Sequence, residues 1–305
     1  MLPSPLWGGN TTETAAPIEQ VQIANMPTLD PRTNPYRPDL AAHHLRGQVD
    51  ARHFVEGIKH QVIEPIADLR RGPAHEAALD TQAQFGDIVT VYETSDEGWC
   101  WGQLASDNYV GYLSANALGP VGAVPTHRVC VPRTFGFPGP DIKLPPMIAL
   151  PMGAVLPIAK DSGRFALNGY GWHFPLSHLM PLTAKAADFV AVAESLLGAP
   201  YLWGGKSSLG IDCSGLVQIA LQAAGVACPR DTYMQEAALG RTTPLDALKR
   251  GDLVFWKGHV AIARDTETII HANAHHMMVA TEPAGEALAR IKAAGSDVTS
   301  VKRLS

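Results

Sequence analysis

The chain of 305 residues is long enough for two or three domains, each with its own core. Hydrophobic residues make up 46% of it and charged residues 17%, which is typical of a folded protein and excludes a disordered or fibrous one. The formal net charge of −5, without any Lys/Arg-rich run, argues against nucleic-acid binding. No stretch approaches the roughly 20 apolar residues of a membrane helix, so no membrane span is predicted.

The cysteines and the N-terminus indicate a reducing environment. Four cysteines lie far apart and form no C-x-x-C pair, which argues against a disulfide scaffold or a zinc ribbon. The first twenty residues contain no cationic segment followed by an apolar one, so no secretory signal is predicted. A cytoplasmic protein with reduced thiols is the simplest expectation. An exported form stays open if the native chain starts further upstream.

Residues 1–60 are predicted to form an arm or a small helical segment. Their opening is rich in Pro, Asn and Thr, which does not favour regular structure. Asp39 is expected to cap a short helix that runs to Leu45.

Residues 61–121 carry short alternating runs that are separated by turn residues. Strands are predicted over 88–92, 99–104 and 109–113. Short strands at such close and regular spacing are typical of a small all-β barrel.

Residues 122–183 repeat this pattern in degenerate form, at a spacing of roughly 60 residues. The matching parts occur in the same order: 152–158 with 85–91, 169–174 with 109–113, and Leu179 with Leu118. The repeat predicts a second small barrel in tandem with the first.

Residues 184–305 have a different pattern, with helices first and strands after. Helices are predicted over 185–197 and 213–224, because apolar residues recur there at helical spacing and a glycine follows each segment. Three short strands are predicted next, over 253–256, 259–264 and 268–272. Helices followed by an antiparallel sheet predict an α+β domain.

The third region also contains a candidate nucleophile. Cys213 follows the predicted N-cap Asp212, so its thiol would lie where backbone N–H groups and the helix dipole favour an anion. A nearby imidazolium of His259 would lower the thiol pKa further. If the strands of His259 and His271 pair in an even register, both rings lie on one face, and His271 can hold the productive tautomer of His259.

Other groups predict less. Three further cysteines are expected to be small buried hydrophobic residues: Cys100, Cys130 and Cys228. His275 and His276 are adjacent, but no Cys or carboxylate lies at ligand spacing in the sequence, so no metal is expected. The loop at 203–205 lacks the lysine and serine of a phosphate-binding loop, so no nucleotide and no other cofactor is expected.

The sequence around these residues closely resembles the NlpC family of papain-like cell-wall peptidases. The matching segments follow the family's order: 198–205, 211–217, 229–235, 250–255, 259–262 and 270–272. The upstream barrels resemble bacterial SH3 domains, and the whole arrangement is similar to the dipeptidyl peptidase VI group. The resemblance implies a multidomain protein in which two small all-β SH3-like barrels precede an α+β papain-like cysteine peptidase domain.

The resemblance also implies roles for individual residues. Cys213 would be the nucleophile, His259 the base and His271 the third polar residue, while the Tyr201 hydroxyl would assist the oxyanion hole. In this group, polar side chains recognise the free amine of the substrate's L-alanine.

Five residues match the substrate-binding positions: Asp212, Ser214 and Trp203 in the peptidase domain, and Tyr109 and Asp87 in the first barrel. Asp87 and Asp212 would together supply the counter-charge for an ammonium group. The alternatives are a packing role for Tyr109 and a solvated turn carboxylate at Asp87.

The group cleaves γ-D-glutamyl-L-diamino acid bonds in peptidoglycan-derived peptides. The expected function is therefore recycling of murein peptides, L-Ala-γ-D-Glu-diamino acid, in the cytoplasm, with either meso-diaminopimelate or L-lysine as the diamino acid. One alternative is an exported hydrolase of intact cell wall, in which the barrels bind the wall. Another is a wall-binding scaffold with a vestigial catalytic domain.

Overall fold

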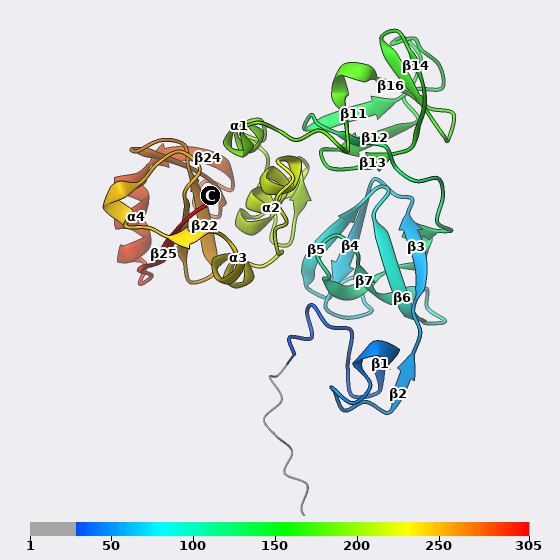
Figure 1. The fold of residues 1–305 in the computed structure, drawn as a ribbon, viewed down its shortest axis with the longest axis horizontal. Coiled ribbons are helices and arrows are strands. Elements are labelled where there is room, and N and C mark those ends of the chain that lie inside the picture. Colours follow the sequence, from blue (N-terminus) through cyan, green and yellow to red (C-terminus); the bar gives the residue numbers. More distant parts are fainter. Residues whose placement is uncertain (1–28, 305) are drawn as a thin grey trace, which may run out of the picture.

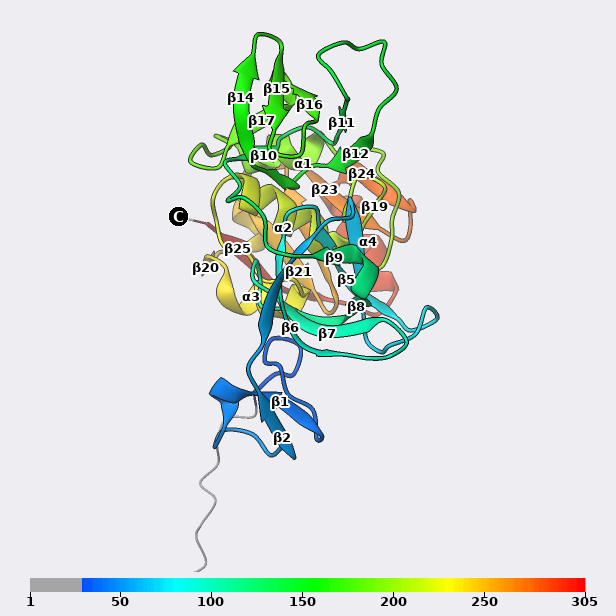
Figure 2. The same ribbon diagram turned by 90° about the vertical axis from the view of Figure 1, so that its right-hand side faces the viewer.

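The structure is a computed structural model that describes residues 29–304. Two β-rich units lie end to end along one side, and a mixed α/β unit lies against their flank (Figures 1 and 2). The N-terminal arm extends beyond the first β-rich unit, at the end opposite the second. No helix of the described residues is long and apolar enough to span a membrane.

The described part of the arm is not the helix that the sequence predicts. Strand β1 (Leu40–Ala42) pairs in parallel with β2 (His53–Val55), and only His43–Leu45 forms a short 3-10 helix. The Asp39 carboxylate accepts hydrogen bonds from the Arg37 guanidinium at 2.9 and 3.0 Å instead of capping a helix. The Asp39 carboxylate therefore binds Arg37, and it does not accept a backbone N–H group of a helix start.

The first β-rich unit is a seven-stranded sheet that confirms the predicted strands to within a few residues. Its strands are β3 (Ile58–Val62), β4 (Ile66–Arg70), β5 (Leu79–Gln84), β6 (Ile88–Thr94), β7 (Trp99–Leu104), β8 (Val110–Ser114) and β9 (Leu118–Gly119). Their order in the sheet is β5-β4-β8-β7-β6-β3-β9. Because β3 belongs to this sheet, the unit begins before the expected boundary at residue 61.

The second β-rich unit divides its strands among three small sheets. The strands are β10 (His127–Val129), β11 (Arg133–Gly136), β12 (Ile148–Pro151), β13 (Val155–Leu156), β14 (Ile158–Ser162), β15 (Phe165–Asn168), β16 (His173–Pro175) and β17 (Leu179–Pro181). A 3-10 turn joins β16 to β17, just as one joins β8 to β9 in the first unit. Leu118 and Leu179, which the sequence repeat pairs, are the first residues of β9 and β17.

The α/β unit contains a six-stranded antiparallel sheet and four helices. The helices are α1 (Phe189–Glu194), α2 (Cys213–Ala223), α3 (Thr232–Ala238) and α4 (Ala284–Ala293). The strands of the sheet are β20 (Arg241–Thr242), β21 (Leu253–Trp256), β22 (His259–Ala263), β23 (Thr268–Asn273), β24 (Met278–Pro283) and β25 (Val298–Arg303), and β18 (Lys206–Ser207) pairs separately with β19 (Gly210–Ile211). The sheet order is β20-β25-β21-β22-β23-β24.

Capping explains where the helices start. Helix α1 is shorter than the predicted 185–197 because Asp188 is its N-cap and accepts the N–H of Val190 at 2.9 Å. Helix α2 agrees with the prediction: Asp212 caps its start, and Gly225, with φ +75°, follows its end. The apolar side of α2 packs on β22 and β23 and forms the largest core of this unit with them.

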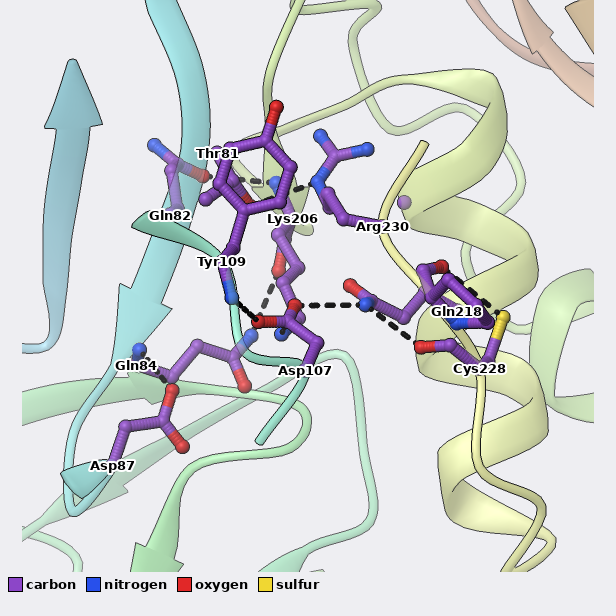
Figure 3. A network of polar contacts seen from close by, with 12 residues as sticks. Thr81, Gln82, Gln84, Asp87, Asp107, Tyr109, Lys206, Gln218, Cys228 and Arg230 are labelled. Atoms are coloured by element: carbon purple, nitrogen blue, oxygen red, sulfur yellow. Dashed lines mark hydrogen bonds and ion pairs between the residues drawn. The ribbon is translucent and has the colours of Figure 1, made fainter. Parts of the chain in front are cut away.

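Buried polar contacts join the first β-rich unit to the α/β unit (Figure 3). The backbone of Lys206 in β18 donates to the Gln82 amide oxygen at 2.9 Å and accepts from Gln84 at 2.7 Å. The Lys206 ammonium lies 3.9 Å from the carboxylate of Asp107, and both side chains are buried. Because buried polar groups are costly without partners, this interface holds the two units in one arrangement.

Gly204 lies at the same interface, where its φ of +77° favours glycine. A Cβ added there would lie 2.7 Å from the carbonyl oxygen of Leu79 in β5. Any larger residue must therefore push the loop before α2 away from the first β-rich unit.

We expect Gly204→Ala to destabilise the protein more than Gly198→Ala does. Gly198 has a φ of +81° but nothing within 4 Å of its would-be Cβ, so that variant carries the backbone strain alone. The difference should be about 1–3 kcal/mol, the usual cost of overpacking. Urea denaturation of both variants measures it, and equal midpoints would contradict the close contact.

Candidate active site

Cys213 is the first residue of α2, and its side chain is almost completely buried. The position follows from the local sequence, because the Asp212 carboxylate accepts the N–H of Gly215 at 2.7 Å and so fixes the first turn of the helix. The same carboxylate accepts the N–H of Gly204 at 2.9 Å, which ties the preceding loop to the helix start.

A buried arginine neutralises Asp212. The guanidinium of Arg230 donates to both Asp212 oxygens, at 2.9 and 2.7 Å, and to the Ser214 hydroxyl at 2.8 Å. It also donates to the Gly205 carbonyl and, across the interface, to the Thr81 hydroxyl at 2.8 Å. All five N–H groups of Arg230 thus have partners, and Asp212 and Ser214 are bound to it.

The buried thiol differs from the sequence expectation. Burial raises the pKa of Cys213 to about 11, and the charge of Asp212 adds to this, although the Val260 N–H and the Thr232 hydroxyl oppose it. The dipole of α2 does not stabilise a thiolate at Cys213, because the thiol is buried and the Asp212 carboxylate lies close to it. The resting group is a neutral thiol.

The two histidines lie together as the sequence predicts. Strands β22 and β23 pair in an even register, Ile262 opposite Ile270, so His259 and His271 share one face. The Nε2 atom of His259 lies 2.8 Å from Nδ1 of His271. Strand β22 begins at His259 and packs against α2, the helix that begins at Cys213.

Burial also sets the charge of the imidazoles. It lowers the pKa of His259 to about 3, with the charges of His271 and Arg290 acting in the same direction. It lowers the pKa of His271 to about 4, against the opposing hydrogen bond and charge of Glu282. Both rings are therefore neutral at pH 7, and His259 is free to accept a proton.

A carboxylate next to the histidines was hidden in the sequence. Ligand atoms of His271, His276 and Glu282 lie within 4.8 Å of one another, although the sequence spacing shows no acid near the His275–His276 pair. Glu282 is bonded to His271 at 2.7 Å and to Arg290 through both of its oxygens. The Glu282 carboxylate is thus already paired with an arginine, and the His276 ring bonds to Asn273 instead.

A cavity of about 330 Å³ opens at the Cys213 thiol. Most of the predicted site residues line it: Tyr109, Tyr201, Trp203, Asp212 and Ser214. Further lining residues come from the arm (Arg32), the first β-rich unit (Arg71 and Asp80) and the α/β unit (Asp231, Thr232, Tyr233, Lys257 and Gly258). Three separate segments of the chain therefore build this one site.

Asp87 is not part of the site, which corrects the prediction. It lines a different cavity, of about 410 Å³, between the two β-rich units and the α/β unit. Its carboxylate accepts the N–H of Gln84 at 2.8 Å and closes the turn after β5, on the side of Gln84 away from Arg230 (Figure 3). Burial raises its pKa. Asp87 and Asp212 therefore do not form the predicted acidic pair.

The other cysteines agree with the prediction in part. All four thiols of the chain are free. Cys100 and Cys228 are buried in apolar surroundings as expected, whereas Cys130 is only half-buried and lines the same cavity as Asp87.

Besides Asp212, the cavity has two acidic residues that the sequence analysis did not single out, Asp231 and Asp80. The Tyr109 hydroxyl donates to Asp231 at 3.3 Å, and Arg32 of the arm pairs with Asp231 at 2.7 Å. Asp80 pairs with Arg71 at 2.6 Å. In the structure Asp231 precedes α3, but its side chain makes no capping bond.

Tyr109 and Tyr201 present hydroxyl groups to the cavity. Tyr109 packs in the barrel core, so its packing role and its contact with Asp231 coexist. Burial raises the pKa of Tyr201 to about 12, so its hydroxyl keeps its proton at pH 7 and can donate a hydrogen bond. Trp203 is 65% exposed and forms an open wall of the cavity.

Comparison with known proteins identifies the family of the chain. Residues 198–290 match the NlpC/P60 family, and residues 69–118 match the bacterial dipeptidyl-peptidase SH3 domain. The γ-D-glutamyl-L-lysine dipeptidyl-peptidase of Bacillus subtilis is 31% identical over 62% of this chain and 68% of its own. The chain belongs to the NlpC/P60 family. It is a cysteine peptidase, with an SH3 domain upstream of its catalytic domain.

Two further NlpC/P60 comparisons cover most of the chain. Dipeptidyl-peptidase 6 of Lysinibacillus sphaericus is 27% identical over 70% of this chain and 86% of its own. A crystal structure of an NlpC/P60 family protein from Bacillus cereus has a TM-score of 0.68 at 20% identity, over 81% of this chain and 99% of that one. It shows the same fold. The second β-rich unit lies outside both matched family segments.

We expect Arg230→Met to cost about 3–5 kcal/mol of stability, because it leaves the Asp212 carboxylate buried and unpaired. The double variant Asp212→Asn with Arg230→Met should recover part of that loss. Arg250→Met is the matched control, since Arg250 pairs with Asp188 and Glu194 on the surface and should cost less than about 1 kcal/mol. Equal losses for the two arginines in urea denaturation would contradict this account.

Proposed function

We propose that this NlpC/P60 peptidase hydrolyses the γ-D-glutamyl-L-diamino acid bond of murein peptides that carry a free N-terminal L-alanine. The observation that carries the proposal is the recess beside the thiol, where Asp231, which pairs with the exposed Arg32, meets the Tyr109 hydroxyl. The printed names of the Bacillus subtilis and Lysinibacillus sphaericus relatives support the class of bond and the release of a dipeptide.

The recess suits a short peptide with a charged amino end. An ammonium group can bind the Asp231 carboxylate through a charge-assisted hydrogen bond. The first barrel supplies Tyr109 and Asp80, so it limits how much peptide fits on the amino side of the scissile bond. Asp212 contributes less than Asp231, because its partner Arg230 is buried and fixed, whereas Arg32, the partner of Asp231, lies on the surface.

The proposed mechanism starts from the neutral Cys213 thiol and the neutral His259 imidazole. His259 takes the thiol proton at Nδ1, the ring nitrogen that His271 does not bond, as Cys213 Sγ attacks the γ-carbonyl carbon of D-glutamate. The backbone N–H of Cys213 and the Tyr201 hydroxyl stabilise the oxyanion. The C–N bond then breaks, and the His259 imidazolium gives its proton to the leaving amine of the diamino acid.

Hydrolysis of the thioester completes the cycle. A water molecule loses a proton to His259 and attacks the thioester carbonyl, so the C–S bond breaks. The products are the free γ-carboxyl group of L-Ala-D-Glu and the Cys213 thiol, which recovers the proton from His259. These steps require no cofactor.

We also propose that residues 122–183 form a second SH3-like barrel. The shared order of strand, 3-10 turn and strand supports it, as do Gly86 and Gly153, which occupy matching positions of the repeat with φ +89° and +96°. A role in peptide recycling would place the protein in the cytoplasm.

The decisive experiment compares free and N-acetylated tripeptides by mass spectrometry, with Cys213→Ala as the blank. L-Ala-γ-D-Glu-meso-diaminopimelate and its L-lysine counterpart should be cleaved to the dipeptide, and their acetylated forms should not. Equal cleavage of free and acetylated peptides would contradict recognition of the amine. Sedimentation of the protein with purified sacculi would favour a wall hydrolase instead.

Asp231→Asn should lower kcat/KM for the free-amine peptide about 10- to 100-fold, the effect of one lost hydrogen bond to a charged group. Asp87→Asn is its matched control, because Asp87 lies outside the recess. If Asp87→Asn reduced the preference for a free amine as much as Asp231→Asn, the placement of the amine would be wrong.

Because the pKa of His259 is lowered, we expect kcat/KM to fall at a lower pH than it does for an enzyme with an ordinary histidine base. A base with the ordinary pKa near 6.5 would lose about tenfold in activity at about pH 5.5. Because His259 stays neutral at lower pH, kcat/KM should fall by less than about twofold between pH 7 and about 5.5. Rates measured across this range, with circular dichroism at each pH to confirm folding, test the prediction, and a tenfold fall contradicts it.

A further inference from the structure

We infer that Glu282, held by Arg290, is a positioning residue that fixes the tautomers of both active-site histidines. The inference rests on the proposed roles of Cys213, His259 and His271, and it extends the site by one charged group beyond them. Glu282 does not contact the nucleophile, so it acts only through His271.

The three side chains form one continuous line of hydrogen bonds. His259 Nε2 lies 2.8 Å from His271 Nδ1, and His271 Nε2 lies 2.7 Å from Glu282 Oε1. The His271 and Glu282 side chains are buried, which strengthens hydrogen bonds between them. Arg290 of α4 donates to both Glu282 oxygens, one of them at 2.7 Å.

Only one arrangement of protons satisfies this line with neutral rings. An ionised carboxylate can only accept, so Nε2 of His271 must carry its proton. Nδ1 of His271 then has a lone pair and accepts from the protonated Nε2 of His259. This leaves Nδ1 of His259 unprotonated, which is the state a base needs. Without Glu282, the reverse arrangement has no charge to oppose it.

The registers of β22, β23 and β24 place His259, His271 and Glu282 along a diagonal of the sheet. Strands β23 and β24 pair with Ile269 opposite Glu282 and His271 opposite Ala280. The β22–β23 register, extended along the strands, places His259 opposite Asn273. The three side chains therefore lie on one face of three adjacent strands, each displaced by two residues along β23 from the next.

Arg290 keeps the Glu282 carboxylate ionised. Burial by itself would raise the pKa of Glu282, but the hydrogen bonds from Arg290 and His271 outweigh it and lower the pKa to about 2. The carboxylate is thus ionised at neutral pH, and the bidentate contact with Arg290 fixes its orientation.

The test uses Glu282→Gln, which keeps the size of the side chain and removes its charge. We expect kcat to fall about 10- to 100-fold, the usual effect of losing such a supporting group, while KM changes by less than about twofold. Glu282→Asp should restore part of kcat because it restores the charge.

Asp252→Asn is the matched control. Asp252 is a buried carboxylate at the start of β21 that pairs with Arg303 through two bonds, at 2.7 and 2.6 Å, and has no histidine partner. This variant should unfold more easily in urea but keep kcat within about twofold, as expected for a structural ion pair. An equal fall of kcat in Asp252→Asn and Glu282→Gln would overturn the inference, because the effect would then be general loosening of the sheet.

Nitrogen-15 NMR of histidine-labelled protein gives a readout that needs no substrate. In the wild type, Nδ1 of His271 should have the shift of an unprotonated nitrogen, and in Glu282→Gln it should move toward the protonated value. Unchanged shifts together with unchanged kcat would overturn the inference. If the wild type cleaved none of the tripeptides but the shift still moved, the proposed substrate would be wrong and the role of Glu282 would stand.

Discussion

The buried ion pair between Arg230 and Asp212 is the interaction on which the rest of the site depends. Asp212 caps α2 at Cys213 and holds the loop at Gly204, while Arg230 matches its charge and reaches Thr81 of the first barrel. A buried pair of this kind adds little net stability but is costly to break. Its contribution is geometric, since it sets the nucleophile, the loop beside it and the barrel in one fixed arrangement.

The site is therefore shared among parts of the chain that lie far apart in sequence. The arm contributes Arg32, the first barrel contributes Tyr109 and Asp80, and the peptidase unit contributes the thiol. The buried contacts of Lys206 and Asp107 keep the barrel against the peptidase unit. The barrel therefore forms one wall of the cavity beside Cys213.

The sequence patterns that predicted the structure correctly were local ones. The errors concern the position of a side chain in the folded protein. The strand and helix boundaries near Cys213, His259 and His271 follow from periodicity and capping. The sequence left the register of the two histidine strands open, and the structure shows that it is even. Asp87 was misplaced because a turn carboxylate can point to either side of a barrel. Asp231 was overlooked because the Tyr109 hydroxyl and Arg32, its partners in the recess, come from distant parts of the chain.

The sequence by itself determined Cys213 at a helix start, the strands that carry His259 and His271, the α+β unit and the first barrel, because each depends on residues close together along the chain. The tertiary structure alone decided which charges meet. Arg230 neutralises Asp212, Asp231 replaces Asp87 in the recess, and Glu282 completes the line of histidines. Burial then set the pKa values, raising that of the thiol and lowering those of the imidazoles, because the cost of a buried charge depends on neighbours that only the folded chain brings together.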